Sequence, residues 1–476
     1  MAISSPAIEA EALQQLRARF RGALLRPGEE GYDEARRIWN GEIDRRPGLI
    51  ARCAGADDVA LAVRFAREHD LPVSVKGGGH AVAGHAVCEA GLMIDLSLMK
   101  AIRVDPAART ARAAGGLLWG ELDRATQAFG LATTGGVISH TGIAGLTLGG
   151  GLGHLMRKHG LSVDNLRAVD LVTAEAQHVR VDAGSEAELF WGLKGGGGNF
   201  GIATAFEYAL HPVGPMVLGG PMFWKLSDAP AVLRFVREWG PTAPDDLGIT
   251  LFARLAPPSP FLAPEQYGKP IVGLLLVWAG DPAAGQKTIA PLRAIGTPLV
   301  DAVKPVPYLF LQSMLDGGAP HGIHYYWKSH RLPKLNDGVI DTLIRRVEAI
   351  TSPLSQISGW AVGGAVSRAP HDATAVGERE VGFELNIIAA WPPANAEPQK
   401  HRAWVREGWE ALRPHSVGVY ANFLSDEDAA GVRAAYGERL GRLTALKDRW
   451  DPTNFFRMNA NIAPSASAAG AGRKGR

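Results

Sequence analysis

The sequence predicts an α+β protein with more than one domain. Its 476 residues predict two or three domains at about 150 residues each. A hydrophobic share of 46% with 21% charged residues is ordinary globular composition. Glycine clusters mark the first half, whereas strands and helices alternate without glycine triplets from Pro212 to Pro414. This change predicts a first part at 1–212, a middle domain at 213–414 and a closing segment at 415–464.

The first part is expected to alternate short strands with amphipathic helices. DDVALAVRFAREHD, residues 57–70, carries acids at its start, as helices do. The helix predicted at 120–130 ends on Gly130, where a left-handed cap is favoured. Strands are predicted at 71–75, 91–97, 108–116, 168–174 and 178–183, the last two as a hairpin. The stretch 465–476 is predicted to be a disordered tail.

Charge, hydropathy and cysteine content exclude several classes of protein. Fifty Lys and Arg against 48 Asp and Glu leave a formal charge of +2, which gives no electrostatic case for a nucleic-acid or anionic-membrane partner. There is no apolar run of about eighteen residues, the length of a spanning helix. Cys53 and Cys88 are too few for a disulfide framework or a multi-cysteine metal site. Without an apolar leader at its start, the chain is expected to be cytoplasmic.

Three glycine clusters, at 77–79, 149–153 and 195–201, favour a phosphate-bearing ligand. Glycine lets backbone N–H groups approach a phosphate without a side-chain clash. A single cluster would be explained as well by tight turns. Three clusters together favour a nucleotide site.

Two common nucleotide sites do not match. The chain has no G-x-x-x-x-G-K-[ST] phosphate loop. Gly196, Gly198 and Gly201 satisfy G-x-G-x-x-G, but a β-like segment follows and no acid lies near position 221. A Rossmann NAD site is therefore not expected.

The histidines and serines give no further site of their own. The pairs His80 and His85, and His154 and His159, are five positions apart, which misaligns them on a helix, so no metal site is predicted. No G-x-S-x-G nucleophile motif is present.

Five ordered motifs carry a family resemblance. They are VKGGGHAVAG (75–84), GGVISHTGIAGLTLGGGLGHLMRKHGLSVDN (135–165), LFWGLKGGGGNFGIAT (189–204), VYANF (419–423) and DPTNFFRMNANI (451–462). From about Trp39 to Pro464 the chain resembles the berberine-bridge-enzyme-like flavoproteins of the vanillyl-alcohol-oxidase superfamily. The resemblance implies a two-part FAD-binding domain, from the first part and the closing segment. It also implies a substrate domain with a mixed or antiparallel sheet flanked by helices.

The resemblance further implies a covalent bond from His80 to the 8α-methyl group of FAD. A neutral imidazole is a good nucleophile near pH 7, which suits this role; the alternative is a loop histidine bonded to the backbone. Many relatives carry a second tether from a cysteine, but Ile138 stands at that position here. A single covalent bond is therefore predicted, with Cys88 as a small buried hydrophobe.

Cofactor contacts follow from the resemblance. They fall on Lys76, Gly77, Gly78, Gly79, His80, Gly84, His85, Gly135, Val137, Ser139, Gly142, Gly145, Gly149, Gly150, Gly153, Gly201, Ile202, Tyr420, Asn459 and Asn461. Lys76 stands where relatives usually have arginine, and His85 where asparagine is common. Asn459 and Asn461 are two apart and would point the same way in an extended chain, although both could simply be turn asparagines.

The catalytic strand is predicted at 382–391. Its alternation puts Glu384 and Asn386 on one face and apolar side chains on the other. An amide cannot act as a base, so the resemblance favours Glu384 as the proton acceptor; the alternative is a solvent-facing edge glutamate. Tyr420 is the second candidate, to orient the substrate or accept its proton. Tyr326 matches another pocket tyrosine, or packs within a strand.

The resemblance implies an FAD-dependent oxidoreductase. It would move a hydride from an alcohol or amine carbon of a small molecule to FAD, and O2 would reoxidise the flavin to give H2O2. A flavin dehydrogenase with poor O2 reactivity, or a flavin-free binding protein that kept the fold, are the alternatives. An aromatic or polyketide-like substrate is favoured by the apolar middle domain. Substrate identity and oligomeric state stay open.

Overall fold

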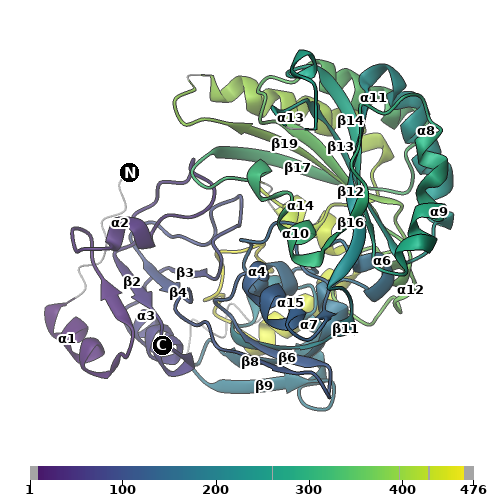
Figure 1. Ribbon diagram of the computed structural model, residues 1–476. Coiled ribbons are helices and arrows are strands. Elements are labelled where there is room, and N and C mark those ends of the chain that lie inside the picture. Colours follow the sequence, from purple (N-terminus) through teal and green to yellow (C-terminus); the bar gives the residue numbers. More distant parts are fainter. Residues whose placement is uncertain (1–8, 260, 396, 427–428, 466–476) are drawn as a thin grey trace.

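The computed structural model describes residues 9–259, 261–395, 397–426 and 429–465. Apart from Ser465, the predicted tail lies outside the described residues. Figure 1 shows two adjoining lobes. The first lobe holds the four- and five-stranded sheets, and the second holds an eight-stranded sheet.

The four-stranded sheet has the order β1-β2-β4-β3, with β4 parallel to both β2 and β3. Its strands are β1 (Ala23–Leu25), β2 (Leu49–Arg52), β3 (Val73–Lys76) and β4 (Leu92–Asp95). Its helices are α1 (Ala10–Arg19), α2 (Tyr32–Ala35) and α3 (Ala56–Glu68). The predicted helix at 57–70 is α3, which buries Val59, Val63 and Ala66 at helical spacing.

The five-stranded sheet is antiparallel, with the order β5-β6-β10-β8-β9. Its strands are β5 (Ile102–Asp105), β6 (Thr110–Ala114), β8 (Leu166–Val172), β9 (His178–Asp182) and β10 (Ile202–Ala209). The elements around it are α4 (Trp119–Gln127), β7 (Leu131–Ala132), α5 (Ile143–Leu148), α6 (Met156–His159), α7 (Ala187–Leu193) and β11 (His211–Pro212). The predicted hairpin is β8 with β9, and Gly130 has φ +65° after α4.

All pairings in the eight-stranded sheet are antiparallel. Seven strands follow the order β15-β12-β14-β13-β18-β19-β17, and the eighth, β16, also pairs with β12. The strands are β12 (Met216–Lys225), β13 (Leu247–Leu255), β14 (Pro270–Trp278), β15 (Val300–Asp301), β16 (Lys304–Pro307), β17 (His324–Leu332), β18 (Gln356–Ala361) and β19 (Phe383–Trp391). The helices are α8 (Ala229–Trp239), α9 (Pro282–Arg293), α10 (Tyr308–Ser313), α11 (Asp337–Glu348), α12 (Ala365–Arg368) and α13 (Pro398–Leu412).

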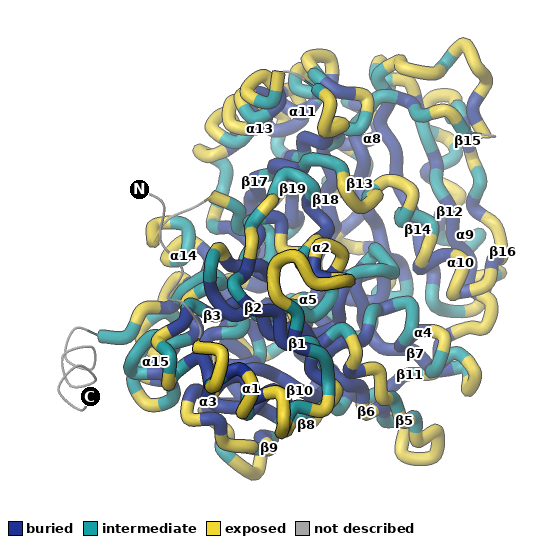
Figure 2. The backbone as a smooth tube through the Cα atoms, turned by 90° about the vertical axis from the view of Figure 1, so that its left-hand side faces the viewer, coloured by how far each residue is buried: buried dark blue, intermediate teal, exposed yellow. Residues whose placement is uncertain are grey.

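One face of this sheet is covered by helices. Figure 1 shows α8, α9, α11 and α13 along the outer side of the second lobe. Figure 2 shows the buried strands β13, β17, β18 and β19 below the partly exposed helices α8, α11 and α13. The apolar core between them holds Leu251, Leu343 and Leu385, so the other face of the sheet is turned toward the first lobe.

The end of the chain returns to the first lobe. Helices α14 (Ala429–Tyr436) and α15 (Leu440–Trp450) pack there, and Leu443 and Leu446 join the core that contains Trp191 of α7. The buried ammonium of Lys447 donates to Asp451 (2.7 Å) and to the carbonyl oxygens of Asn199 (2.8 Å) and Phe456 (2.9 Å). These bonds fix the closing segment against the third glycine cluster.

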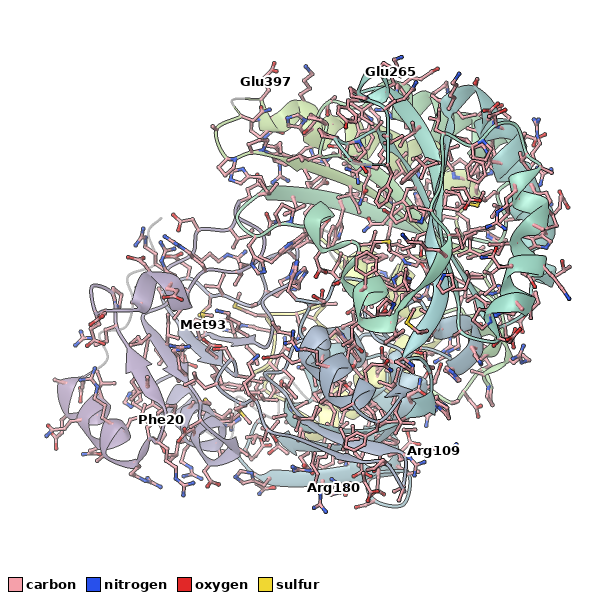
Figure 3. All side chains as sticks on the ribbon, viewed as in Figure 1. Phe20, Met93, Arg109, Arg180, Glu265 and Glu397 are labelled. Carbon is pink, nitrogen blue, oxygen red and sulfur yellow. The ribbon has the colours of Figure 1, made fainter. Side chains whose placement is uncertain are left out.

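Figure 3 shows the charged side chains of Arg180, Glu265 and Glu397 at the rim of the molecule. Among the described residues, no helix is both long and apolar enough to span a membrane.

Candidate active site

A cavity of about 570 Å³ separates the glycine-rich loops of the first lobe from the uncovered face of the eight-stranded sheet. We call its first side the glycine wall; the glycines that line it are Gly77, Gly78, Gly79, Gly136, Gly142, Gly145, Gly149, Gly197, Gly198 and Gly201. We call its second side the sheet wall; its main residues are Phe223, Phe252, Arg254, Leu275, Tyr325, Trp327, Gln356, Ser358, Trp360, Asn386 and Ile388.

On the glycine wall, segments approach too closely for any side chain. A Cβ atom at Gly78 would lie 2.3 Å from the backbone nitrogen of Gly142, and one at Gly149 would lie 2.0 Å from Oδ1 of Asn422. Gly79 and Gly201 have φ of +69° and +155°, which other residues rarely adopt. After Gly201 the chain enters strand β10 rather than a helix, which agrees with the absence of a Rossmann site.

His80 lies at the end of the first glycine cluster and lines the cavity. Its ring stacks on Trp39, with centroids 4.5 Å apart, and its Nε2 is hydrogen-bonded to Nδ1 of His140 at 2.8 Å. Burial, followed by the nearby imidazoles of His140 and His321, holds the pKa of His80 well below its usual range. The ring is therefore neutral at pH 7.

The cluster of His80, His140 and His321 is a feature that the sequence analysis missed. Their ligand nitrogens lie within 4.8 Å of one another, close enough that the group could hold a metal ion. The sequence analysis compared only histidines five positions apart, whereas these are separated by 60 positions or more. No local pattern marks such a group.

The sheet wall follows from strand alternation and register. Phe252 of β13 pairs with Ser358 of β18, which pairs with Asn386 of β19, and all three line the cavity. The intervening residues Leu251 and Leu385 turn to the helix-covered core. As predicted, Asn386 lies on the face opposite Phe383, Leu385, Ile387 and Ala389, which join the helix-covered core.

Tyr420 reaches the cavity from the segment before the 3-10 turn Ala421–Phe423. Its hydroxyl oxygen accepts hydrogen bonds from the N–H of Gly151 (2.6 Å) and from Nδ2 of Asn422 (3.1 Å). Burial is the main cause that raises the pKa of Tyr420 to about 12, although these two donors lower it. The phenol is therefore neutral at pH 7. Because its oxygen accepts from these two donors, its own O–H is available to donate to another group.

Glu384 shares a face with Asn386 but does not line the cavity. It lies behind Tyr420, where Oε1 accepts a 2.6 Å hydrogen bond from Nε of Arg331, and both side chains are 3% exposed. Burial raises the pKa of the Glu384 carboxyl, and Arg331 opposes that rise. The solvent-facing alternative does not hold, since the carboxyl is buried.

The expected position of Tyr326 is corrected by the structure. Its hydroxyl donates to Asp426 and accepts from Nε of Arg406 (3.1 Å), on the side of β17 away from the cavity. Tyr325 and Trp327 line the cavity instead. Neighbouring residues of a strand point to opposite faces, so a shift of one position reverses the placement.

The predicted cofactor residues divide into two groups. Those that line the cavity are Gly77, Gly78, Gly79, His80, His85, Val137, Gly142, Gly145, Gly149, Gly201, Ile202, Tyr420 and Asn459. Those that do not line it are Lys76, Gly84, Gly135, Ser139, Gly150, Gly153 and Asn461.

The second group supports the cavity from behind. Lys76 donates to the carbonyl oxygen of Ala35 (2.7 Å), and Ser139 Oγ donates to Asp316 (2.5 Å). A Cβ atom at Gly153 would lie 1.9 Å from the carbonyl oxygen of Gly135, so these two glycines allow backbone packing. The chain bends between Asn459 and Asn461 instead of running extended, and only the first faces the cavity.

Comparison with known proteins identifies the family. Residues 47–182 match the family model described as an FAD binding domain, and residues 419–463 match the one described as berberine and berberine like. An FAD-linked oxidoreductase of Dictyostelium discoideum is 31% identical, over 93% of this chain and 95% of its own length. The chain belongs to the berberine-bridge-enzyme-like family of FAD-linked oxidoreductases.

Other members of this flavoprotein family are similarly close. The (R)-6-hydroxynicotine oxidase of Paenarthrobacter nicotinovorans is 30% identical, over 94% of this chain and 98% of the relative. The crystal structure of 6-hydroxy-D-nicotine oxidase from Arthrobacter nicotinovorans superposes with a TM-score of 0.84 at 28% identity, covering 94% of this chain and 98% of that one. The chain is thus an FAD-linked oxidoreductase with the fold of its superfamily.

The residues present fit FAD. The glycine wall offers main chain that no Cβ atom shields, and Asn459 and Asn386 each carry a buried Oδ1 without a hydrogen-bond partner. Buried polar atoms of this kind are normally satisfied, so they indicate room for a polar ligand. Ile138 lines the cavity and both cysteines are buried elsewhere, so among the described residues no thiol faces it.

Proposed function

We propose that this family member is an oxidase that takes a hydride from an alcohol or amine carbon of a small aromatic molecule, with FAD linked covalently to His80 and O2 as the electron acceptor. The supporting observation is the single cavity that joins the glycine wall and His80 to an aromatic sheet wall. Residues 1–212 and 415–464 form its FAD-binding domain, and residues 213–414 its substrate domain. We propose a cytoplasmic location.

The glycine wall and Asn459 hold the cofactor. Backbone N–H groups at Gly77–Gly79 and Gly197–Gly198, which line the cavity, would bind the pyrophosphate and ring, and Gly201 and Ile202 would hold the adenosine end. When bound, FAD accepts the substrate hydride and passes both electrons to O2, releasing H2O2.

His80 provides the attachment point. Its imidazole is held neutral by burial, so a ring nitrogen carries a lone pair at pH 7. Its Nε2 is engaged by His140 at 2.8 Å, which would leave Nδ1 to bond the 8α carbon. In that step one methyl proton and the imidazole N–H proton would be lost, and the two electrons of the broken C–H bond would pass through the flavin to O2. The stacked Trp39 restricts ring rotation and so keeps that nitrogen toward the cavity.

Tyr420, and not Glu384, handles the substrate proton in this proposal. Its oxygen already accepts two hydrogen bonds, so its O–H can orient the substrate alcohol or amine. Tyr420 can take the substrate proton only as a phenolate, so its own proton must first pass to solvent. The same two donors and the Arg331 guanidinium, 5.8 Å from the ring centroid, favour the phenolate, whereas the Glu384 carboxylate opposes it. Glu384 acts behind it, by fixing Arg331.

The sheet wall supplies the substrate class. Phe223, Phe252, Trp327 and Trp360 give the cavity flat apolar surfaces, which suit an aromatic ring. Asn386 and Ser358 are polar groups on the same wall that can orient a hydroxyl or amine.

The test is anaerobic reduction of the purified yellow protein by a panel of aromatic alcohols and amines, followed by admission of air. We expect one substrate to bleach the flavin and air to restore it with one H2O2 per turnover. Bleaching without reoxidation by air would identify a dehydrogenase instead. A colourless protein would leave only the binding-protein alternative and overturn the proposed function.

A further inference from the structure

Arg254 stands apart among the cavity residues. Of the described residues that line the cavity, it is the one arginine or lysine, and none is an aspartate or glutamate. It lies near the end of β13, where alternation turns it, with Phe252, toward the cavity. A cationic side chain there needs a counterpart.

No protein carboxylate provides that counterpart. Nη1 of Arg254 donates to Oε1 of Gln356 (3.0 Å) and Nε to the carbonyl oxygen of Leu255 (3.3 Å), both neutral acceptors. Among the described residues no acidic group forms an ion pair with this guanidinium, and Nη2 makes no hydrogen bond. Burial lowers the pKa of Arg254, and no nearby charge opposes that effect. A desolvated cation without a partner is costly unless a ligand supplies the anion.

The register gives its position relative to the reacting groups. Arg254 pairs with Gln356, which pairs with Ile388, one row along from the Phe252, Ser358 and Asn386 row. Along a strand, successive residues on one face are two positions apart, about 7 Å. Across the sheet, the two strand spacings from β13 to β19 add about 10 Å. Arg254 and Asn386 are therefore separated by about the length of an aromatic molecule, with Gln356 and Ser358 on the strand between them and Phe252 beside Arg254 on β13.

We propose that Arg254 binds a carboxylate of the substrate, so that this oxidase acts on aromatic alcohols or amines that also carry an acid group. The inference rests on the proposed function. The carboxylate accepts from the free edge of the guanidinium, the aromatic body lies against Phe252 and Trp327, and the oxidisable carbon lies toward Asn386 and Tyr420. A neutral analogue leaves the half-buried cation without an anionic partner, so the site selects the acid.

The test measures binding of paired probes to the FAD-loaded protein by calorimetry. The pairs are 3-phenylpropanoate with 3-phenylpropanamide and indole-3-propanoate with indole-3-propanamide, none of which has an alcohol or amine carbon to oxidise. We expect at least one acid to bind about 10- to 100-fold more tightly than its amide, as a charge-assisted hydrogen bond predicts. Equal affinities within both pairs would overturn the inference.

Variants locate the effect. Arg254→Gln should remove the preference for the acid and leave amide binding unchanged. Arg254→Lys keeps the charge, so it should keep the preference with weaker binding because the planar fork is lost; it also serves if the glutamine variant does not fold. Lys304→Gln removes an exposed cation from edge strand β16 and should change neither affinity. A preference that survives Arg254→Gln would overturn the inference.

Two further measurements separate the possible roles. FAD content and flavin midpoint potential should be unchanged in Arg254→Gln; loss of FAD, or a large fall in potential, would assign the guanidinium to the cofactor and overturn the inference. A yellow oxidase that binds acids and amides equally would leave the proposed function intact. A colourless protein that still prefers acids through Arg254 would overturn the proposed function and leave the carboxylate site standing.

Discussion

On the glycine wall the main chain itself meets the cavity, whereas on the sheet wall large side chains do. Gly78 and Gly149 leave no room for a Cβ atom, while Phe252 and Trp360 line the cavity with aromatic side chains. The glycine wall can therefore bind the same cofactor throughout the family, because its backbone groups are not altered when side chains change. The sheet wall can change its ligand by changing side chains, which explains how one fold serves several substrates.

The largest effect is expected at Tyr420, where the two walls meet. Tyr420→Phe removes the hydroxyl that we propose orients the substrate and, as phenolate, takes its proton, so turnover should fall about 10²- to 10⁴-fold. Steady-state H2O2 production measures this, once a substrate is known. Tyr325→Phe is the matched control, since that hydroxyl donates to the carbonyl oxygen of Pro320 (2.8 Å). If both variants retain wild-type turnover, Tyr420 has no role in proton transfer.

The next effect concerns the buried pair behind the sheet wall. Glu384→Gln leaves the Arg331 guanidinium buried without a carboxylate, which should cost about 3–5 kcal/mol of folding free energy. Thermal unfolding of the FAD-loaded protein measures the loss. Glu410→Gln breaks an exposed ion pair with Arg413 and should leave the midpoint unchanged. Equal midpoints for both variants would contradict the account.

A substitution on the glycine wall should have a smaller cost. Gly78→Ala forces two main-chain segments apart and should lose about 1–3 kcal/mol of stability, together with FAD binding. Gly441→Ala, in α15, has open space around it and should be neutral or stabilise by up to about 1 kcal/mol. The unfolding midpoint and the FAD absorbance of the two variants give the comparison. Full FAD content in Gly78→Ala would show that the wall tolerates side chains.

The smallest effect is a pH dependence shared by the two sides. Burial lowers the pKa of His85, which lines the cavity on the side of the glycine wall, from 6.5 to about 4. It lowers the pKa of His330, beneath the sheet wall, by the same amount. In the unfolded chain these rings take up protons below pH 6.5, whereas the folded rings stay neutral. Stability is therefore complete above pH 6.5 and falls by about 1 kcal/mol per histidine between pH 6.5 and 5.5. Unfolding midpoints at the two pH values should differ less in His330→Gln than in the wild type.

The glycine wall could be predicted from the sequence because its constraints are local. Gly77, Gly78 and His80 lie within four consecutive positions. A run of glycines shows directly that these positions carry no side chain. The glycine clusters predict a nucleotide site, and the family resemblance that the motifs carry implies FAD and the fold of the FAD-binding domain. His85, Val137 and Ile202, which the resemblance implies as cofactor contacts, line the cavity.

The sheet wall could be predicted only in part, because it depends on register between strands far apart in the chain. Alternation gave the shared face of Glu384 and Asn386, but not the partner Arg331, which is 53 positions away. Tyr325 lines the cavity where Tyr326 was predicted, because neighbouring residues of a strand point to opposite faces. No local sequence pattern distinguishes Arg254 from other arginines in strands. Its place on the cavity side is known only from the pairing of β13 with β18.

The attachment of FAD to His80 is tested most directly by acid precipitation of the purified protein, followed by absorbance of the pellet and supernatant and by intact mass. The account predicts that the yellow colour stays with the pellet, that the mass is raised by one FAD, and that His80→Ala releases the colour while the protein stays folded. Colour that moves entirely to the supernatant of the wild-type protein, with the mass of the bare chain, would contradict it.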